Sequence, residues 1–172
     1  MMNTNFFVWN CRGPASLAFY RNCKQYDYKH KPVLIVIMET RISPLKLKKY
    51  VQLLGFDGYQ FSEVNEYSGG IIVAWKEEVI RVDVLDIHFQ FLHLMVTLQN
   101  GKIFCFTPIY ASPQEEMRND LWNKLHNISR TMIGEWLLAG DFNDIAHPIE
   151  EKGAMPAQQR KCDKFVDKIN AC

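Results

Sequence analysis

The stretch Leu137-Leu138-Ala139-Gly140-Asp141-Phe142-Asn143 is a short apolar run that stops at a glycine and then presents an acid and an amide. In an extended chain, alternate side chains point to opposite faces, so Asp141 and Asn143 share one side while Phe142 packs on the other. A carboxylate accepts hydrogen bonds and an amide both donates and accepts, so the pair could orient a water molecule and hold a phosphate oxygen. The alternative is a strand that runs into an ordinary Asx turn.

The segments around this stretch alternate between helical and extended patterns. Ser112-Pro113-Gln114-Glu115 fits a capping box and opens the clearest helix, Ser43-Pro44 opens another, and Asn100-Gly101 favours a hairpin turn. Helices are also expected near residues 15–28 and at 165–169. The other predicted strands cover residues 6–9, 33–38, 59–62, 71–75, 79–87, 91–98 and 102–109. This order predicts an α/β layered sandwich rather than an all-β barrel.

Composition and length narrow the class of protein. The chain has 172 residues, 48% of them hydrophobic and 23% charged, as is typical of a single globular domain. Its formal charge of +1 creates no general field that would recruit nucleic acid or an acidic membrane. Any binding of phosphate must therefore come from a local patch or from a metal ion.

Cysteine usage and the apolar runs bear on location. The five cysteines are odd in number and none are spaced as Cys-x-x-Cys, which predicts reduced thiols. The apolar run 33–38 is far too short to cross a bilayer, and the first residues lack a basic targeting region. We expect a nuclear or cytoplasmic protein that is not secreted and has no membrane partner.

Polar residues recur where predicted strands end. Asn10 follows the first strand, Glu39 follows the second, Tyr110 follows the strand 102–109, and Asp141 with Asn143 ends a later one. Strand ends converge on one edge of layered α/β folds, where ligands commonly bind, and a carboxylate there suits Mg²⁺. The alternatives are an N-cap-like or surface acid at position 39 and a packing tyrosine at position 110.

Arg12 and Arg41 closely follow two of these strand-end residues, so either could reach a phosphate group. Surface salt bridges are the competing interpretation for both arginines.

Five short motifs occur in an order that a known family shares: Trp9-Asn10-Cys11-Arg12-Gly13, Glu39-Thr40-Arg41, Ser68-Gly69-Gly70 with Trp75, Ile109-Tyr110-Ala111-Ser112-Pro113, and Leu138-Ala139-Gly140-Asp141-Phe142-Asn143. Through them the chain resembles the endonuclease/exonuclease/phosphatase superfamily, and most closely the endonuclease domain of plant LINE-type (non-LTR) retrotransposons. The resemblance spans nearly the whole chain. It implies a DNase I-like fold of two facing β-sheets flanked by helices.

The resemblance also implies an activity, namely cleavage of phosphodiester bonds in DNA with Mg²⁺, or alternatively Mn²⁺, as the cofactor. By this resemblance Asn10 and Glu39 belong to the metal site, with Glu39 as the principal ligand. Tyr110 supports the phosphate-binding network, Asp141 orients or deprotonates the attacking water, and Asn143 holds the scissile phosphate. No protein partner is implied.

The chain departs from the family pattern at its end. Family members carry a late Ser-Asp-His segment and another acid-containing strand motif, whereas this sequence ends at Cys172 without them. We therefore expect one domain, residues 1–172, incomplete at its C-terminus, with weak or absent catalysis. None of the five histidines replaces the missing one by motif.

Two other functions stay open at this point. One is a non-catalytic remnant that binds nucleic acid through Lys46, Lys48, Lys49 and neighbouring arginines. The other is a phosphatase of the same fold that acts on a small phosphoester.

Overall fold

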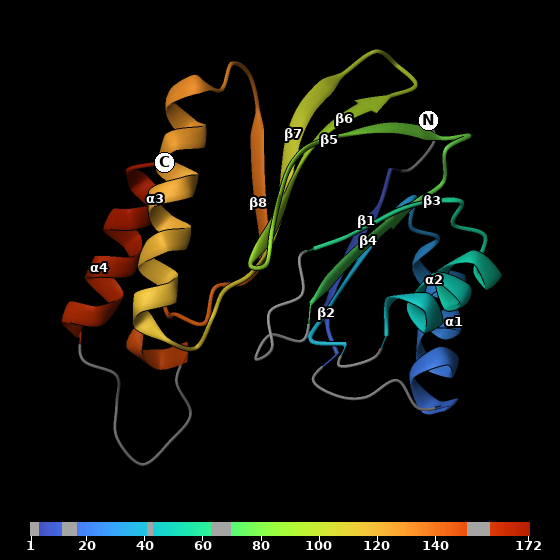
Figure 1. Cartoon of the computed structure of the whole chain (residues 1–172), viewed down its shortest axis with the longest axis horizontal. Helices are drawn as coiled ribbons and strands as arrows, with labels where there is room; N and C mark the ends of the chain where they lie inside the picture. Colours follow the sequence, from blue (N-terminus) through green and yellow to red (C-terminus); the bar gives the residue numbers. More distant parts are fainter. Residues whose placement is uncertain (1–3, 12–16, 41–42, 63–69, 151–158) are drawn as a thin grey trace. The chain divides into compact units, whose positions relative to one another are not determined.

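A computed structural model describes residues 4–11, 17–40, 43–62, 70–150 and 159–172 (Figure 1). The chain divides into two compact units, and each is described by itself. The sandwich unit comprises Met1–Tyr110 and Gly134–Gly140, and the helical unit comprises Ala111–Ile133 and Asp141–Cys172. None of the described helices has the length and apolar character needed to cross a membrane.

The first sheet of the sandwich unit has the strand order β1-β2-β4-β3. Its strands are β1 (Phe6–Asn10), β2 (Leu34–Met38), β4 (Ile71–Trp75) and β3 (Gly58–Phe61). β1 and β2 run parallel, and the other pairs are antiparallel. The central strand β2 is fully buried, as its unbroken apolar sequence predicts.

The second sheet has the order β5-β6-β7-β8. Its strands are β5 (Ile80–His88), β6 (Phe91–Leu98), β7 (Ile103–Tyr110) and β8 (Trp136–Asp141). β5, β6 and β7 pair antiparallel, and β6 and β7 are joined by the tight turn that Asn100-Gly101 predicts. Strands β7 and β8 both end at residues that the sequence singled out.

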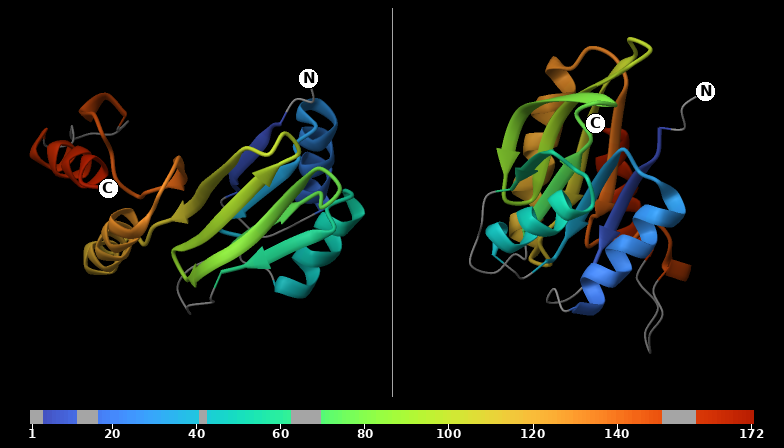
Figure 2. Two further views of the ribbon diagram at one scale, coloured as in Figure 1. Left: turned by 90° about the horizontal axis from the view of Figure 1, so that it is seen from above. Right: turned by 90° about the vertical axis from the view of Figure 1, so that its right-hand side faces the viewer.

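Side-chain alternation along β2 builds two apolar layers. Leu34, Val36 and Met38 pack with residues of the second sheet such as Leu94 and Phe106. The intervening Ile35 and Ile37 pack against the two helices α1 (Leu17–His30) and α2 (Pro44–Leu53). Figure 2 shows both helices on the outer side of the first sheet. The expected fold of two facing sheets flanked by helices is confirmed.

The helical unit contains α3 (Glu115–Thr131), a short 3₁₀ turn (Pro148–Glu150) and α4 (Gln159–Asn170). The capping box expected at Ser112 does not form, because α3 begins later, with Gln114 at its N-cap. Instead, the Ser112 hydroxyl accepts a bond from the Gln114 N–H at 3.2 Å. The hydroxyl thus closes a local turn before the helix rather than capping its third residue.

Gly140, near the end of β8, marks the closest packing between strand ends in the sandwich unit. Its φ is +144°, and a Cβ added there would overlap the Ile109 carbonyl and lie 2.7 Å from Met38 Cε. Only a residue without a side chain fits this position. Gly140 therefore allows the ends of β8, β7 and β2 to meet.

We predict that Gly140→Ala lowers the free energy of unfolding by at least about 1 kcal/mol more than Gly101→Ala, because overpacking adds to backbone strain. Gly101 also has a positive φ, +83°, but nothing lies within 4 Å of an added Cβ. An alanine at position 101 therefore adds backbone strain without any steric overlap. Urea unfolding followed by circular dichroism measures both. Equal losses for the two variants would contradict the close packing at Gly140.

Candidate functional site

Asn10 and Glu39 lie at the same edge of the first sheet. β1 and β2 are parallel and in register, with Asn10 opposite Met38, the residue before Glu39. Just beyond β1, the Cys11 N–H donates to the Met38 carbonyl at 3.2 Å, and the Cys11 thiol donates to the same oxygen at 3.1 Å. These bonds hold the two strand ends together where the chain presents an amide and a carboxylate.

The backbone of Glu39 adopts an unusual conformation. Its φ is +55°, in the left-handed region, and its N–H donates to the Gly70 carbonyl at 3.1 Å. A non-glycine residue in this region costs about 1–3 kcal/mol and persists where the surroundings enforce it, often at functional sites. Among the described residues, Lys31 and Asn143 are the other non-glycine residues with positive φ. Two of these three are residues that the sequence assigned to the site.

Tyr110, the last residue of β7, has a packing role. Its ring is half-buried and packs against the core between the two sheets, and its N–H donates to the Gln90 carbonyl at 2.9 Å. The packing interpretation of Tyr110 is therefore correct for part of the side chain. A phenol can pack through its ring and still use its hydroxyl group.

Three strand ends of the sandwich unit converge at Gly140. Met38 of β2 and Ile109 of β7 are the two residues that an added Cβ at Gly140 would strike. The residues that come next in the chain are Glu39, Tyr110 and Asp141. Glu39, Tyr110 and Asp141 are therefore each attached to one of these three packed positions.

Within the helical unit, Asp141 and Asn143 form an Asx turn. The Asn143 N–H donates to Asp141 Oδ1 at 2.9 Å, and the φ of Asn143 is +47°. The turn that the sequence left as an alternative is thus present. The expectation that strand alternation places both side chains on one face is wrong, because β8 ends at Asp141 and the chain turns before Asn143.

Ala111 fixes the position of this turn. The Ala111 N–H donates to the Asp141 carbonyl at 2.8 Å, and the Asn143 side-chain NH₂ donates to the Ala111 carbonyl. An NH₂ group has two hydrogens, so the bond to Ala111 leaves one that can donate to an anionic oxygen. The arrangement orients an amide donor next to a carboxylate.

Phe142 anchors the turn from the opposite direction. Its ring stacks on Trp122 of α3, with centroids 5.8 Å apart and planes 13° apart, and meets the edge of Phe165 of α4 at 5.5 Å. Trp122 and Phe165 also contact each other, at 5.8 Å. The sequence predicted that Phe142 packs inward. Its partners could not be named, since they lie 20 or more residues away in the chain.

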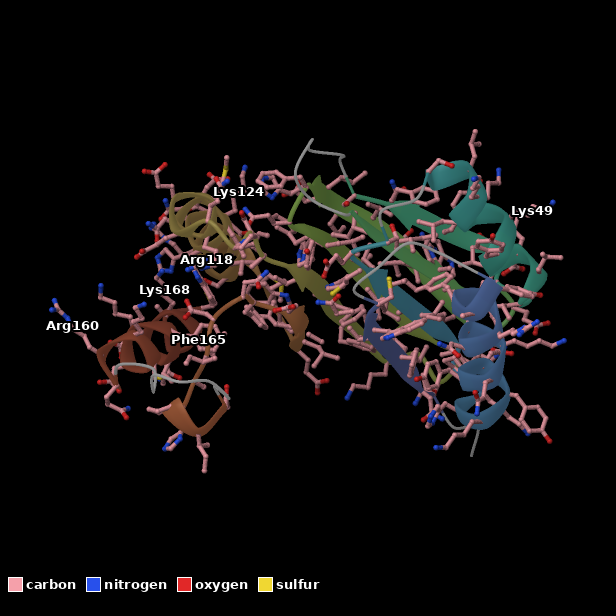
Figure 3. All side chains as sticks on the ribbon, turned by 90° about the horizontal axis from the view of Figure 1, so that it is seen from below. Lys49, Arg118, Lys124, Arg160, Phe165 and Lys168 are labelled. Carbon is pink, nitrogen blue, oxygen red and sulfur yellow. The ribbon has the colours of Figure 1, made fainter. Side chains whose placement is uncertain are left out.

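Arg118 of α3 is a further supporting residue that sequence reasoning missed. Its Nη1 donates to the carbonyls of Ser112 and Pro113 at 3.0 and 2.6 Å, and its Nε lies 3.9 Å from Asp144 Oδ2. It thereby joins the loop before α3 to the residue after Asn143. No sequence signal marked it, because two of its partners are backbone carbonyls. Figure 3 labels Arg118 and Phe165.

None of the five histidines bonds to Asp141, Asn143 or Ala111 in the contacts described for it. Arg12 and Arg41 lie outside the described residues. Each histidine makes a local contact: His30 with the ring of Phe7, His88 with the Gln90 N–H, His93 with the Thr107 hydroxyl, His126 with the Ala171 carbonyl and His147 with the Ile149 N–H. Burial lowers the pKa of His93, although Asp86 acts in the opposite direction.

The donor set at the first sheet edge suits a hard cation. Asn10 and Glu39 offer amide and carboxylate oxygens, and Mg²⁺ commonly takes one or two carboxylates and keeps several waters. Within the described ranges, no three residues of the types His, Cys, Asp and Glu come together as a metal cluster. The residues present therefore fit a water-rich Mg²⁺ site better than a cage of protein ligands.

Several solved structures share this fold. The AP endonuclease LMAP from Leishmania major matches with a TM-score of 0.67 and 14% identity, over 96% of this chain and 66% of that one. The endonuclease domain of TRAS1, a telomere-specific non-LTR retrotransposon, gives 0.67 and 14%, over 96% and 70%. Humanized D. rerio TDP2 gives 0.60 and 11%, over 80% and 61%. This chain spans only 43% of the length of another solved chain with the same fold, that of ANGEL2, a 2',3'-cyclic phosphatase.

A comparison with curated protein sequences found no significant match. The model of the Endonuclease/Exonuclease/phosphatase family, in contrast, matches residues 7–157, which include Asn10, Glu39, Tyr110, Asp141 and Asn143. The match covers well over half of the chain. The chain belongs to the endonuclease/exonuclease/phosphatase family.

Proposed function

We propose that this chain is an endonuclease derived from a retroelement, which hydrolyses phosphodiester bonds in DNA slowly, in a Mg²⁺-dependent reaction. The observation that carries the proposal is the packing of Met38, Ile109 and Gly140, because the next residue after each is a polar one assigned to the site. The fold shared with the TRAS1 retrotransposon endonuclease and the Leishmania major AP endonuclease supports a nucleic-acid substrate. The closer resemblance to plant LINE-type endonucleases rests on the sequence motifs.

Glu39 and Asn10 would hold the metal ion. A bound Mg²⁺ supplies positive charge that offsets the charge developing on the phosphate oxygens. Glu39 contributes the carboxylate, and its left-handed backbone fixes the direction in which the side chain leaves β2. Asn10 contributes an uncharged oxygen from the neighbouring parallel strand.

Asp141 would act on the attacking water. Its Oδ1 already accepts the Asn143 N–H, which holds the carboxylate in one orientation. An ionised carboxylate in a fixed orientation can accept a hydrogen bond from water and take its proton as the oxygen attacks phosphorus.

Asn143 and Tyr110 would act on the phosphate group. The Asn143 amide, held by Ala111, donates its second hydrogen to a phosphate oxygen. Tyr110 supports the phosphate-binding network through its hydroxyl group. Donors that are already oriented stabilise developing charge without the cost of reorganising.

Replacing Glu39 tests the metal role. We predict that the wild type nicks supercoiled plasmid only with Mg²⁺ or Mn²⁺. Glu39→Gln should lower the nicking rate at least about 100-fold, because replacing a residue that merely hydrogen-bonds to a metal ligand already lowers activity about 10–100-fold. Gel quantification of the nicked form measures this. Glu78→Gln, in the turn before β5, is the matched control and should keep full activity.

Three results would contradict the proposal. They are nicking that persists in Glu39→Gln, DNA binding that needs no Mg²⁺ and leads to no cleavage, and turnover of a soluble phosphoester without turnover of DNA.

Replacing Asp141 tests the base. Asp141→Asn keeps an oxygen that can accept the Asn143 N–H, so the turn should survive while the base is lost. We predict that the nicking rate falls about 10²–10⁴-fold, while the midpoint temperature of thermal unfolding stays unchanged. Asp167→Asn, on the exposed side of α4, is the control. Full activity in Asp141→Asn would exclude this residue as the base.

A further inference from the structure

Helix α4 carries its positive charges on one side. Its basic residues are Arg160, Lys161, Lys164 and Lys168. At 3.6 residues per turn these four positions fall within an arc of about 100° around the helix axis. We refer to these four residues as the basic face of α4. Arg160, Lys161 and Lys164 are exposed, and Lys168 is partly buried.

The charges of the basic face are not neutralised within the described part of the chain. No ion pair there joins any of the four side chains to a carboxylate. The acidic residues of α4, Asp163 and Asp167, project outside the arc, and Asp163 accepts a bond from Gln159 at 2.9 Å. Asp144, Glu150 and Asp163 act on Cys162, which lies on another side of α4 from this arc. Like charges in one arc repel one another, and an anion bound along the arc would relieve that repulsion.

Two of these cations occupy a position that disfavours the helix. Arg160 and Lys161 lie in the first turn of α4, and that turn contains no acidic residue. The N-terminal end of a helix carries partial positive charge, so cations there weaken the helix and raise the local positive potential. Arg160 and Lys161 therefore add to the positive potential at this end of the basic face.

The basic face connects to the Asp141 turn within the helical unit. Lys168 Nζ donates to Asn119 Oδ1 at 3.1 Å and lies 5.9 Å from the centre of the Trp122 ring. Trp122 in turn stacks on Phe142, between Asp141 and Asn143. Figure 3 shows Lys168 on the side of α4 toward α3 and Arg160 projecting away from the end of α4. An anion held by this face is therefore bound beside the packing that holds the turn.

The linear spacing of the basic face favours an extended polyanion. Arg160, Lys164 and Lys168 are one helical turn apart, so the row extends about 12 Å at 1.5 Å per residue. A single phosphate group needs donors that converge on one point. A nucleic-acid strand instead presents a phosphate about every 3.4 Å of helix rise, which several cations in a row can follow.

We propose that the basic face of α4 binds the sugar–phosphate backbone of duplex DNA beside the Asp141 turn, an inference that rests on the proposed function. The contact is with the backbone, so it holds DNA of any sequence and supplies affinity rather than sequence preference. It positions the substrate and takes no part in bond cleavage.

The test compares two triple variants that remove the same charge. One is Arg160→Gln with Lys161→Gln and Lys164→Gln. The control is Arg21→Gln with Lys24→Gln and Lys29→Gln, three exposed cations of α1. Fluorescence anisotropy measures binding to a labelled duplex in EDTA, where cleavage cannot occur, over a range of salt concentrations.

We expect the α4 triple variant to bind at least about tenfold more weakly than wild type at low salt. The slope of log affinity against log salt should fall by about three, because each DNA phosphate that the protein no longer neutralises lowers the slope by about 0.9. The α1 triple variant should stay within twofold. The midpoint temperature of thermal unfolding should be no lower for the α4 variant than for wild type, because the variant loses two unfavourable cations from the first turn of α4.

Equal weakening in both triple variants, or no weakening in the α4 variant, would overturn the inference. So would binding to phosphatidylserine vesicles through α4 without binding to DNA. In nicking assays with Mg²⁺, the α4 variant should raise KM and leave kcat within twofold. DNA binding through α4 without nicking would leave this inference standing and refute the proposed function. Nicking with the same KM in wild type and the α4 variant would support the proposed function and refute this inference.

Discussion

The close approach of the Gly140 backbone to the Ile109 carbonyl and to Met38 is the constraint on which the candidate site depends. Any side chain at position 140 would separate the ends of β2, β7 and β8. With glycine there, the three strands end in contact. A fold that brings several strand ends to one place can aim polar groups from distant parts of the sequence at one ligand. Glycine at position 140 is in this sense a steric requirement of the packing between these strand ends.

Periodicity and turn chemistry predicted much of the sandwich unit. The unbroken apolar run at 33–38 became the buried central strand β2, and Asn100-Gly101 became a hairpin turn. Both signals arise from neighbouring residues, so a single sequence contains them. The strand-end positions of Asn10 and Glu39 followed from the same patterns.

The parts that could not be predicted depend on hydrogen bonds that compete with regular structure. Ser112 bonds to its neighbour Gln114 instead of capping α3. Asp141 bonds to Asn143 and ends the strand, so the alternation of side chains stops there. Periodicity carries no information about such choices, which depend on the local geometry of short polar side chains. The left-handed backbone of Glu39 was equally beyond reach, since it follows from the bond to Gly70 across the sheet end.

The turn in the helical unit is held by contacts between residues far apart in sequence. Phe142 packs between Trp122 and Phe165, and such aromatic pairs are worth about 0.5–1.5 kcal/mol beyond the area they bury. Arg118 adds bonds to backbone carbonyls and an ion pair with Asp144. Sequence reasoning proposed the polar residues of the candidate site, while the residues that orient Asp141 and Asn143 emerged only from the packed structure.

The central claim is that Glu39, at the end of β2, is a metal ligand. Calorimetric titration of Mg²⁺ into the wild type and into Glu39→Gln and Glu78→Gln tests it without reference to catalysis. The account predicts one ion bound by the wild type and by Glu78→Gln, and at least about tenfold weaker binding by Glu39→Gln. The same affinity in all three proteins would contradict it.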